Sequence, residues 1–244
     1  MPSQPDGGTG TGGGAATPGT PAAGGGSGTT GTIAPAPYVP PSPGTITAAR
    51  AILNDGGRIY AGGPITLQSA NISNNGGTMS LASLTVKQPT FDNRGGTLNI
   101  SNGFNANVDR FDNSGGKLNA GSLNIATSGD LINVDGTLTS ASDTSLTVGG
   151  KADNTRGAIS ATGALNAAVA GATNNTGGPL ASNQGLMLSS GSLDNTKGSI
   201  RSAQAGVQLA VSNQLVNGNG GTIDAATDLN VQAGSLANGG SLRG

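Results

Sequence analysis

Apolar and polar residues alternate in short runs along residues 45–244, and the runs recur about every twenty residues. Each recurrence opens with the pattern Gly-x-[Ile/Leu/Met], in which the glycines are 19 to 23 residues apart. These glycines are Gly57, Gly77, Gly96, Gly116, Gly136, Gly157, Gly178, Gly198, Gly221 and Gly240. A fixed period of this length is typical of a solenoid, in which each unit stacks on copies of itself.

Two further apolar columns follow the same period. Alternating pairs such as Leu123/Ile125 and Leu186/Leu188 come after each Gly motif, and a single apolar residue precedes a recurring Asn by two positions. Alternation with period two indicates half-buried strands, and no ten-residue window carries the helical period. We therefore expect three strands of about three to five residues per unit, stacked as an all-β parallel β-helix of about ten ~20-residue coils.

A corner of the form Asn-x-Gly-Gly recurs in nearly every unit. Its asparagines are Asn54, Asn74, Asn93, Asn113, Asn133, Asn154, Asn175, Asn195, Asn217 and Asn238. We expect Gly and Asn here because both tolerate the positive φ that a tight corner requires. Asparagines stacked at one corner can also pass side-chain hydrogen bonds from coil to coil. Residues 91–98 nearly repeat as 111–118, so Phe91 and Phe111 should stack in adjacent coils.

Residues 1–44 differ in composition from the repeat. They contain nine of the twelve prolines together with much Gly, Thr and Ala, and such a segment buries too little apolar surface to offset its ordering entropy. The sequence thus predicts a disordered Gly/Pro-rich linker over 1–44 and the β-helix over 45–244. Tyr38 and Val39 could instead fold back as a partial cap.

Small inward residues weaken the repeat between residues 149 and 179. Ala152, Ala167, Val169 and Ala172 stand where other units have larger apolar residues, and Thr155-Arg156-Gly157 lacks the Gly pair. We expect this coil to be the narrowest and softest of the rod.

Charge and composition exclude several classes of protein. The net charge is −1, and charged residues make up 9% of the chain without a run of one sign, which argues against a nucleic-acid surface. The chain has no Cys and no His, so disulfides, zinc sites of those ligands and a Ser-His-Asp triad cannot exist. No window of the sequence is apolar enough to predict a transmembrane helix. The N-terminal residues MPSQPDGGTG do not have the pattern of a signal peptide. The repeat begins and stops within a unit, so we expect a segment of a longer exported chain.

The repeat resembles the haemagglutinin repeats of the filamentous haemagglutinin family, large exoproteins exported by two-partner secretion. The similarity rests on units such as FDNRGGTL, LDNTKGSI and LANGGSL followed by L-x-[I/V/L], and it covers about residues 45–244. The resemblance implies a right-handed β-helical filament, secreted or on the bacterial surface. It also implies an outer-membrane secretion transporter and a host or neighbouring-cell receptor or glycan as partners. Contact-dependent inhibition proteins carry similar repeats in their stalks.

Candidate chemistry is sparse, because all twelve acidic residues are Asp. Asp92, Asp112, Asp153 and Asp194 precede the corner Asn and could bind Ca²⁺ or act as an acid/base pair, but we favour Asp side chains that cap backbone N–H groups. For an enzyme, Asp109, Arg110 and Asp112 are the best candidates. A third class, an ice-binding array, would use Thr78, Thr97, Thr137 and Thr222, a column that Lys117 and Pro179 interrupt.

We therefore assign no catalytic, cofactor-binding or metal-binding residue and expect a non-enzymatic structural or adhesive segment. The alternative is a carbohydrate-active β-helix enzyme, a polysaccharide lyase or hydrolase. It is disfavoured because the repeat lacks the dense cluster of acidic and basic residues and the long loops that such sites need.

Overall fold

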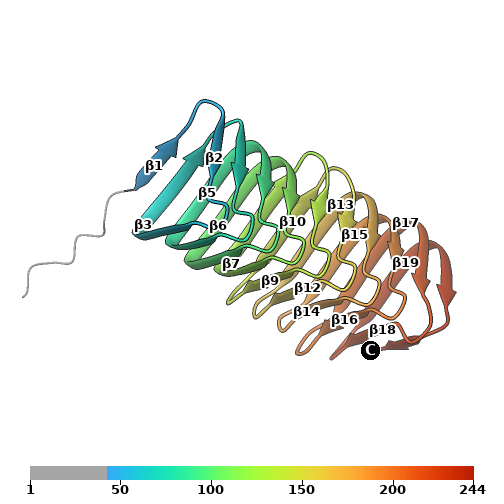
Figure 1. Cartoon of the computed structure of the whole chain (residues 1–244). Helices are drawn as coiled ribbons and strands as arrows, with labels where there is room; N and C mark the ends of the chain where they lie inside the picture. The colour runs from blue at the N-terminus through green and yellow to red at the C-terminus, as the bar shows by residue number, and fades with distance from the viewer. Residues whose placement is uncertain (1–42) are drawn as a thin grey trace, which may run out of the picture. The chain divides into compact units, whose positions relative to one another are not determined.

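The computed structural model describes residues 43–244, which form twenty β-strands and no helix (Figure 1). Neighbouring strands pair in parallel, each with the strand one coil away, and together they form a single sheet wound into about ten coils. The predicted parallel β-helix is confirmed. Residues 1–42 of the predicted linker and the alternative cap of Tyr38 and Val39 lie outside the described residues, and Gly44, placed at the end of the linker, already begins the first strand.

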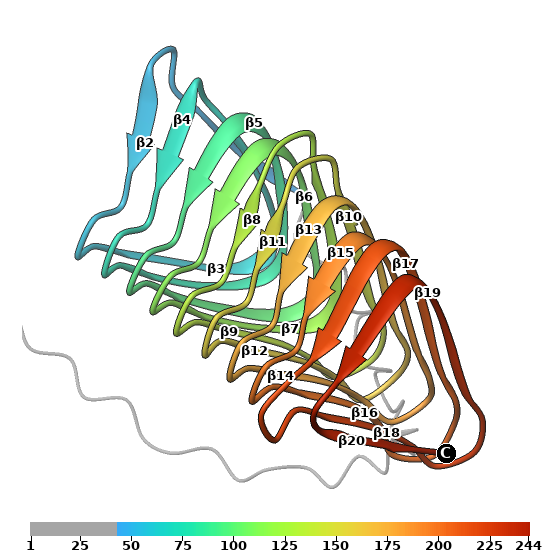
Figure 2. The same ribbon diagram turned by 90° about the vertical axis from the view of Figure 1, so that its right-hand side faces the viewer.

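Each coil has three faces, which we call first, second and third in chain order after the Gly of the corner (Figure 2). Strands confined to the first face are β9 (Thr137–Ser140), β12 (Ala158–Ala161), β14 (Pro179–Ser182), β16 (Ser199–Ser202), β18 (Thr222–Ala225) and β20 (Ser241–Arg243). Those confined to the second face are β1 (Gly44–Thr47) and β10 (Thr144–Val148). Those confined to the third face are β2 (Ala51–Leu53), β4 (Asn71–Ser73), β8 (Leu131–Ile132) and β11 (Ala152–Asp153).

The remaining strands continue from one face to the next, so strand lengths range from 2 to 16 residues rather than three to five. First and second faces are joined in β3 (Arg58–Gln68) and β7 (Lys117–Thr127), and second and third faces in β13 (Leu165–Asn174), β15 (Leu186–Asp194), β17 (Val207–Asn217) and β19 (Leu229–Asn238). β5 (Thr78–Asp92) and β6 (Thr97–Asp112) cover all three faces. The chain bends there at register shifts, for example between Ile100 and Gly103, without losing its extended backbone.

The inward side chains of the three faces fill the interior as stacked columns. Leu98 and Leu118 from the first face, and Ile125 from the second, are fully buried. Phe91 and Phe111 are in register on the third face, with ring centroids 5.2 Å apart and planes 8° from parallel, which confirms the predicted stack. Phe104 of the second face joins them at 6.1 and 5.9 Å, so three rings form one aromatic cluster inside the rod.

One predicted core position is wrong. Ala172 is only half-buried, and its neighbour Thr173 points inward, where its hydroxyl lies 2.9 Å from that of Ser190. Alternation explains this choice, because Leu165, Val169 and Thr173 are buried and lie an even number of residues apart, whereas Ala172 is out of phase with them. Leu236 is in register with the buried Leu215, as its apolar column predicts, but it is 48% exposed because no described coil lies on its far side. The expectation that the coil at residues 149–179 is the softest of the rod stays a prediction.

Ten asparagines form a continuous ladder along the corner before the first face. The Nδ2 of each donates to the Oδ1 of the Asn in the next coil, in nine consecutive hydrogen bonds of 2.7 to 2.8 Å. All ten except Asn238 are buried. The same amide nitrogen also reaches backbone carbonyls, as Asn113 does with Gly116 at 3.3 Å and Thr137 at 3.2 Å. The predicted ladder is confirmed.

The two glycines of the corner are required for different physical reasons. Only the first is required for its positive φ, as predicted. Gly115 has φ +62°, and in three coils Asp135, Arg156 or Lys197 adopts that conformation instead. The second glycine is present in every coil, and from Gly77 onward the preceding coil passes too close for a side chain. A Cβ on Gly116 would lie 2.3 Å from the carbonyl oxygen of Asn93. The ten ladder asparagines have no positive φ, so their role is the ladder and not the turn, whereas Asn219 in the corner after Asn217 has φ +41°.

Alanine substitutions should separate the two glycine roles. Gly115→Ala should destabilise the rod by about 1–2 kcal/mol, the strain of a left-handed alanine. Gly116→Ala should destabilise it by about 3 kcal/mol or more, because the backbones of two coils must move apart. Thermal unfolding followed by circular dichroism compares the two variants. Equal losses of stability would show that positive φ, and not close approach, explains both glycines.

Converting one ladder residue to an acid should make stability depend on pH. In Asn113→Asp the introduced carboxylate cannot donate to Asn133, and it faces backbone carbonyl oxygens. Stability at pH 7 should fall by about 3 kcal/mol or more. Burial raises the pKa of this carboxyl, so the protonated form should donate again and stability should recover as the pH falls.

The matched control is Asn238→Asp. Asn238 only accepts ladder hydrogen bonds, from Asn217 and from the backbone of Gly240, and its side chain is exposed. This variant should change the unfolding temperature little at any pH. A similar loss in both variants at pH 7 would argue against a stabilising ladder.

Candidate binding surface

The four predicted aspartates lie at the end of the third face and cap the corner backbone. Each accepts a hydrogen bond from the N–H two residues later, at 2.8 to 3.0 Å. The donors to Asp92, Asp112, Asp153 and Asp194 are Arg94, Ser114, Thr155 and Thr196. Asn174 caps Thr176 in the same way, so the cap does not require a charge. The favoured interpretation of these residues, capping, is confirmed.

The adjacent pair Asp92 and Asp112 is engaged by arginine rather than arranged for a cation. Arg94 lies 2.6 Å from Asp92, and Arg110 lies 2.8 Å from Asp112, whose side chain is only 7% exposed. Within residues 43–244 no three His, Cys, Asp or Glu side chains gather as a ligand set for a metal ion. The geometry therefore supports ion pairs at this corner.

The candidate enzymatic residues do not converge on one point. Asp109 accepts a hydrogen bond of 2.7 Å from Ser128 at the bend between the second and third faces, while Arg110 turns to Asp112. The threonine column is interrupted as predicted, because Lys117 lies in register between Thr97 and Thr137. Neither arrangement supplies a site.

Two aspartates have perturbed acidities. Partial burial alone raises the pKa of Asp92, but hydrogen bonds from the Arg94 side chain and backbone, with the charges of Arg94 and Arg110, hold the pKa below its ordinary value of 3.8. A hydrogen bond from Arg156 likewise lowers the pKa of the exposed Asp135. Arg156 and Asp135 occupy the same corner position in adjacent coils, and their side chains lie 2.7 Å apart.

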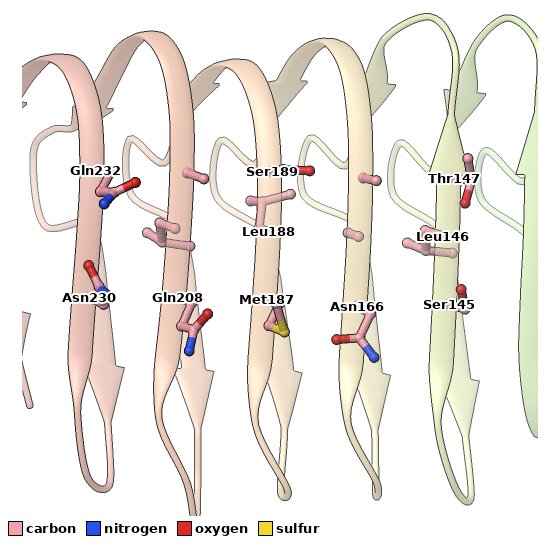
Figure 3. Close-up of a pocket in the computed structure, with 14 residues that line it drawn as sticks. Ser145, Leu146, Thr147, Asn166, Met187, Leu188, Ser189, Gln208, Asn230 and Gln232 are labelled. Carbon is pink, nitrogen blue, oxygen red and sulfur yellow. The ribbon is translucent and has the colours of Figure 1, made fainter.

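A concavity lies on the outside of the second face, across β10, β13, β15, β17 and β19 (Figure 3). It is an open groove with a cavity volume of about 540 Å³, and a second hollow of about 480 Å³ adjoins it. Alternation along each strand turns Leu146, Leu188 and Leu209 inward and leaves two outward columns. One is Ser145, Asn166, Met187, Gln208 and Asn230, and the other is Thr147, Ala168, Ser189, Ala210 and Gln232.

No charged side chain lines this groove. The four amides Asn166, Gln208, Asn230 and Gln232 are exposed, and they make no side-chain hydrogen bond to the part of the chain that the structure describes. Reasoning from the sequence missed this surface, because it followed the inward residues and the acids. The signal was nonetheless present, since the polar residue inside each apolar pair, as in Leu186-Met187-Leu188, must point outward.

A charge-poor stack of three-sided parallel coils, with one ladder corner and no converging catalytic groups among residues 43–244, defines a β-solenoid. The haemagglutinin repeat family model matches the chain three times, at residues 43–86, 80–135 and 202–243, which together cover more than half of it. The chain belongs to the haemagglutinin repeat family. No curated protein and no solved structure matches it significantly. Among the described residues no helix is long and apolar enough to cross a membrane.

The structure also extends the repeat through residues 136–201, which the family model does not match. The ladder is unbroken there, with Asn154 donating to Asn175 and Asn175 to Asn195 at 2.8 and 2.7 Å. The strands of this stretch keep the parallel register of their neighbours. The rod is therefore one continuous repeat.

Acid titration should reveal the ion pair of Asp92. The pKa of Asp92 is lowered in the folded state, so its carboxylate stabilises the fold fully at pH values above its ordinary pKa of 3.8. This contribution is lost as the pH falls through the lower pKa of the folded state. Asp92→Asn keeps the cap, as Asn174 shows, and should cost no more than about 1 kcal/mol at pH 7. Thermal unfolding from pH 7 to 2 should show the wild-type advantage vanish below pH 3.8. An advantage that persists at pH 2 would contradict the ion pair.

Proposed function

We propose that this chain is a non-enzymatic structural and adhesive segment of a filamentous haemagglutinin-like exoprotein, secreted or exposed on the bacterial surface. The family match carries the proposal, because members of this repeat family are generally structural or adhesive. A stiff rod of about ten coils, about 45–50 Å long at the usual strand spacing, suits both a spacer and an extended binding surface.

Its partners follow from the same membership. A two-partner secretion transporter of the outer membrane exports the chain as part of the exoprotein, and the side faces of the rod contact a receptor or glycan on a host or neighbouring cell. The outward residues support such a role, since many are amides and hydroxyls that can both donate and accept hydrogen bonds. The finer alternative within this class is the stalk of a contact-dependent inhibition protein, in which the rod mainly presents a distal domain.

Antibody against residues 45–244 tests the location directly. Fractionation of native cells should place the reactive protein in the medium or on the surface, where protease added to intact cells removes it. A cytoplasmic protein that resists protease in intact cells would overturn the proposal. Beads coated with the purified chain should then attach to target cells above the level of albumin-coated beads if the segment is adhesive, and not if it is a stalk.

A further inference from the structure

The outward residues of the second face form a ridge beside a trough. The ridge is the column Asn166, Met187, Gln208 and Asn230, and the trough is the neighbouring column Ala168, Ser189 and Ala210 (Figure 3). Met187 is 52% exposed, an unusual position for a large apolar side chain. Both columns run along the rod axis, because the strands lie in register from coil to coil.

This face is also free of charge over most of its length. From Asn105 to Gln232 its two outward columns contain only Asn, Gln, Ser, Thr, Ala and Met. Charged residues lie at the margins of this face: Lys87 is in register with Asn107 one coil earlier, and the exposed Asp143 and Asp228 immediately precede β10 and β19. Two such faces can therefore approach each other without like-charge repulsion and without burying an ion.

We propose that the second face binds the second face of another copy of this chain, with the two rods parallel. A twofold axis along the rods places the ridge of each copy over the trough of the other, so Met187 enters the space above Ser189 and Ala210 of the partner. The two columns are two residues apart along each strand, about 6.6 Å. A twofold axis midway between them therefore sets the ridge of one copy opposite the trough of the other.

Antiparallel rods do not fit in the same way. A twofold axis across the rods leaves each column at its own position along the strand, so ridge meets ridge and trough meets trough. The parallel pair thus fills the trough, whereas the antiparallel pair holds the faces apart. Over the three coils in which Ala168, Ser189 and Ala210 form the trough, shape therefore favours the parallel direction.

The size of the face predicts a weak pair. Seven coils of five-residue strands measure about 34 by 17 Å, so the two copies together bury about 1,100 Å², close to the lower limit for specific interfaces. We expect a reversible dimer of the isolated chain at high concentration. The pairing does not depend on the proposed adhesive function, because it is tested with purified protein alone.

Cysteine cross-linking tests both the surface and the direction, since the chain has no native cysteine. Asn107→Cys and Gln232→Cys place single thiols at exposed outward positions six coils apart, about 29 Å along the rod. In parallel pairs each variant should cross-link to a second copy of itself through a thiol reagent that spans about 12 Å. This length combines the distance of about 10 Å between facing sheets with the offset of about 6.6 Å between the two columns. A mixture of the two variants that gives mainly Asn107→Cys to Gln232→Cys products would overturn the parallel arrangement.

A charge in the trough provides the second measurement. Ala210→Glu fills the trough and should lower the cross-linked fraction by about tenfold or more, because each dimer would bury two unpaired carboxylates. The matched control is Asn119→Glu, which adds the same charge at an exposed position of the first face and should leave cross-linking unchanged. Circular dichroism verifies that both variants are folded. Equal cross-linking in all variants, or a wild-type chain that stays monomeric while it binds a neutral polysaccharide, would overturn the proposal.

Discussion

The rod depends on one repeated interaction, the hydrogen bond from the amide of each corner Asn to the next. Nine of these bonds run in series through a region that excludes water, where an unpaired amide would be costly. The ladder requires the coils to be close, and that closeness in turn excludes any side chain at the second glycine of the corner. One interaction therefore explains both of the most regular residues of the repeat.

Much of the fold could be predicted from the sequence because the same pattern of residues recurs in each of about ten coils. Period, strand alternation, the ladder and the Phe91–Phe111 stack all follow from positions that recur in register. Local departures could not be predicted in the same way. Ala172 was placed inward because it is apolar, whereas the inward position belongs to the polar Thr173, which is in phase with Val169. The strict second glycine was assigned to φ because close approach between coils is not visible in one coil.

The site was predicted less well than the fold, for a physical reason. Acidic residues attract attention in a sequence, but here they serve the corner, as caps and ion pairs. The surface with a distinctive shape contains no charged residue and no reactive group, and it arises from the sizes of neighbours that are twenty residues apart. Uncharged surfaces of this kind show only when coils are stacked, because their features run across the strands rather than along them.

The aromatic cluster has a consequence for how the coils find their order. Every step of the ladder is chemically the same, so the ladder alone does not distinguish the correct neighbour of a coil from the next one along. Phe91, Phe104 and Phe111 occur together only once, and a slip by one whole coil would set Phe91 against Leu131 and break the cluster. These three rings thus distinguish the correct alignment of the coils from one that is shifted by a whole coil.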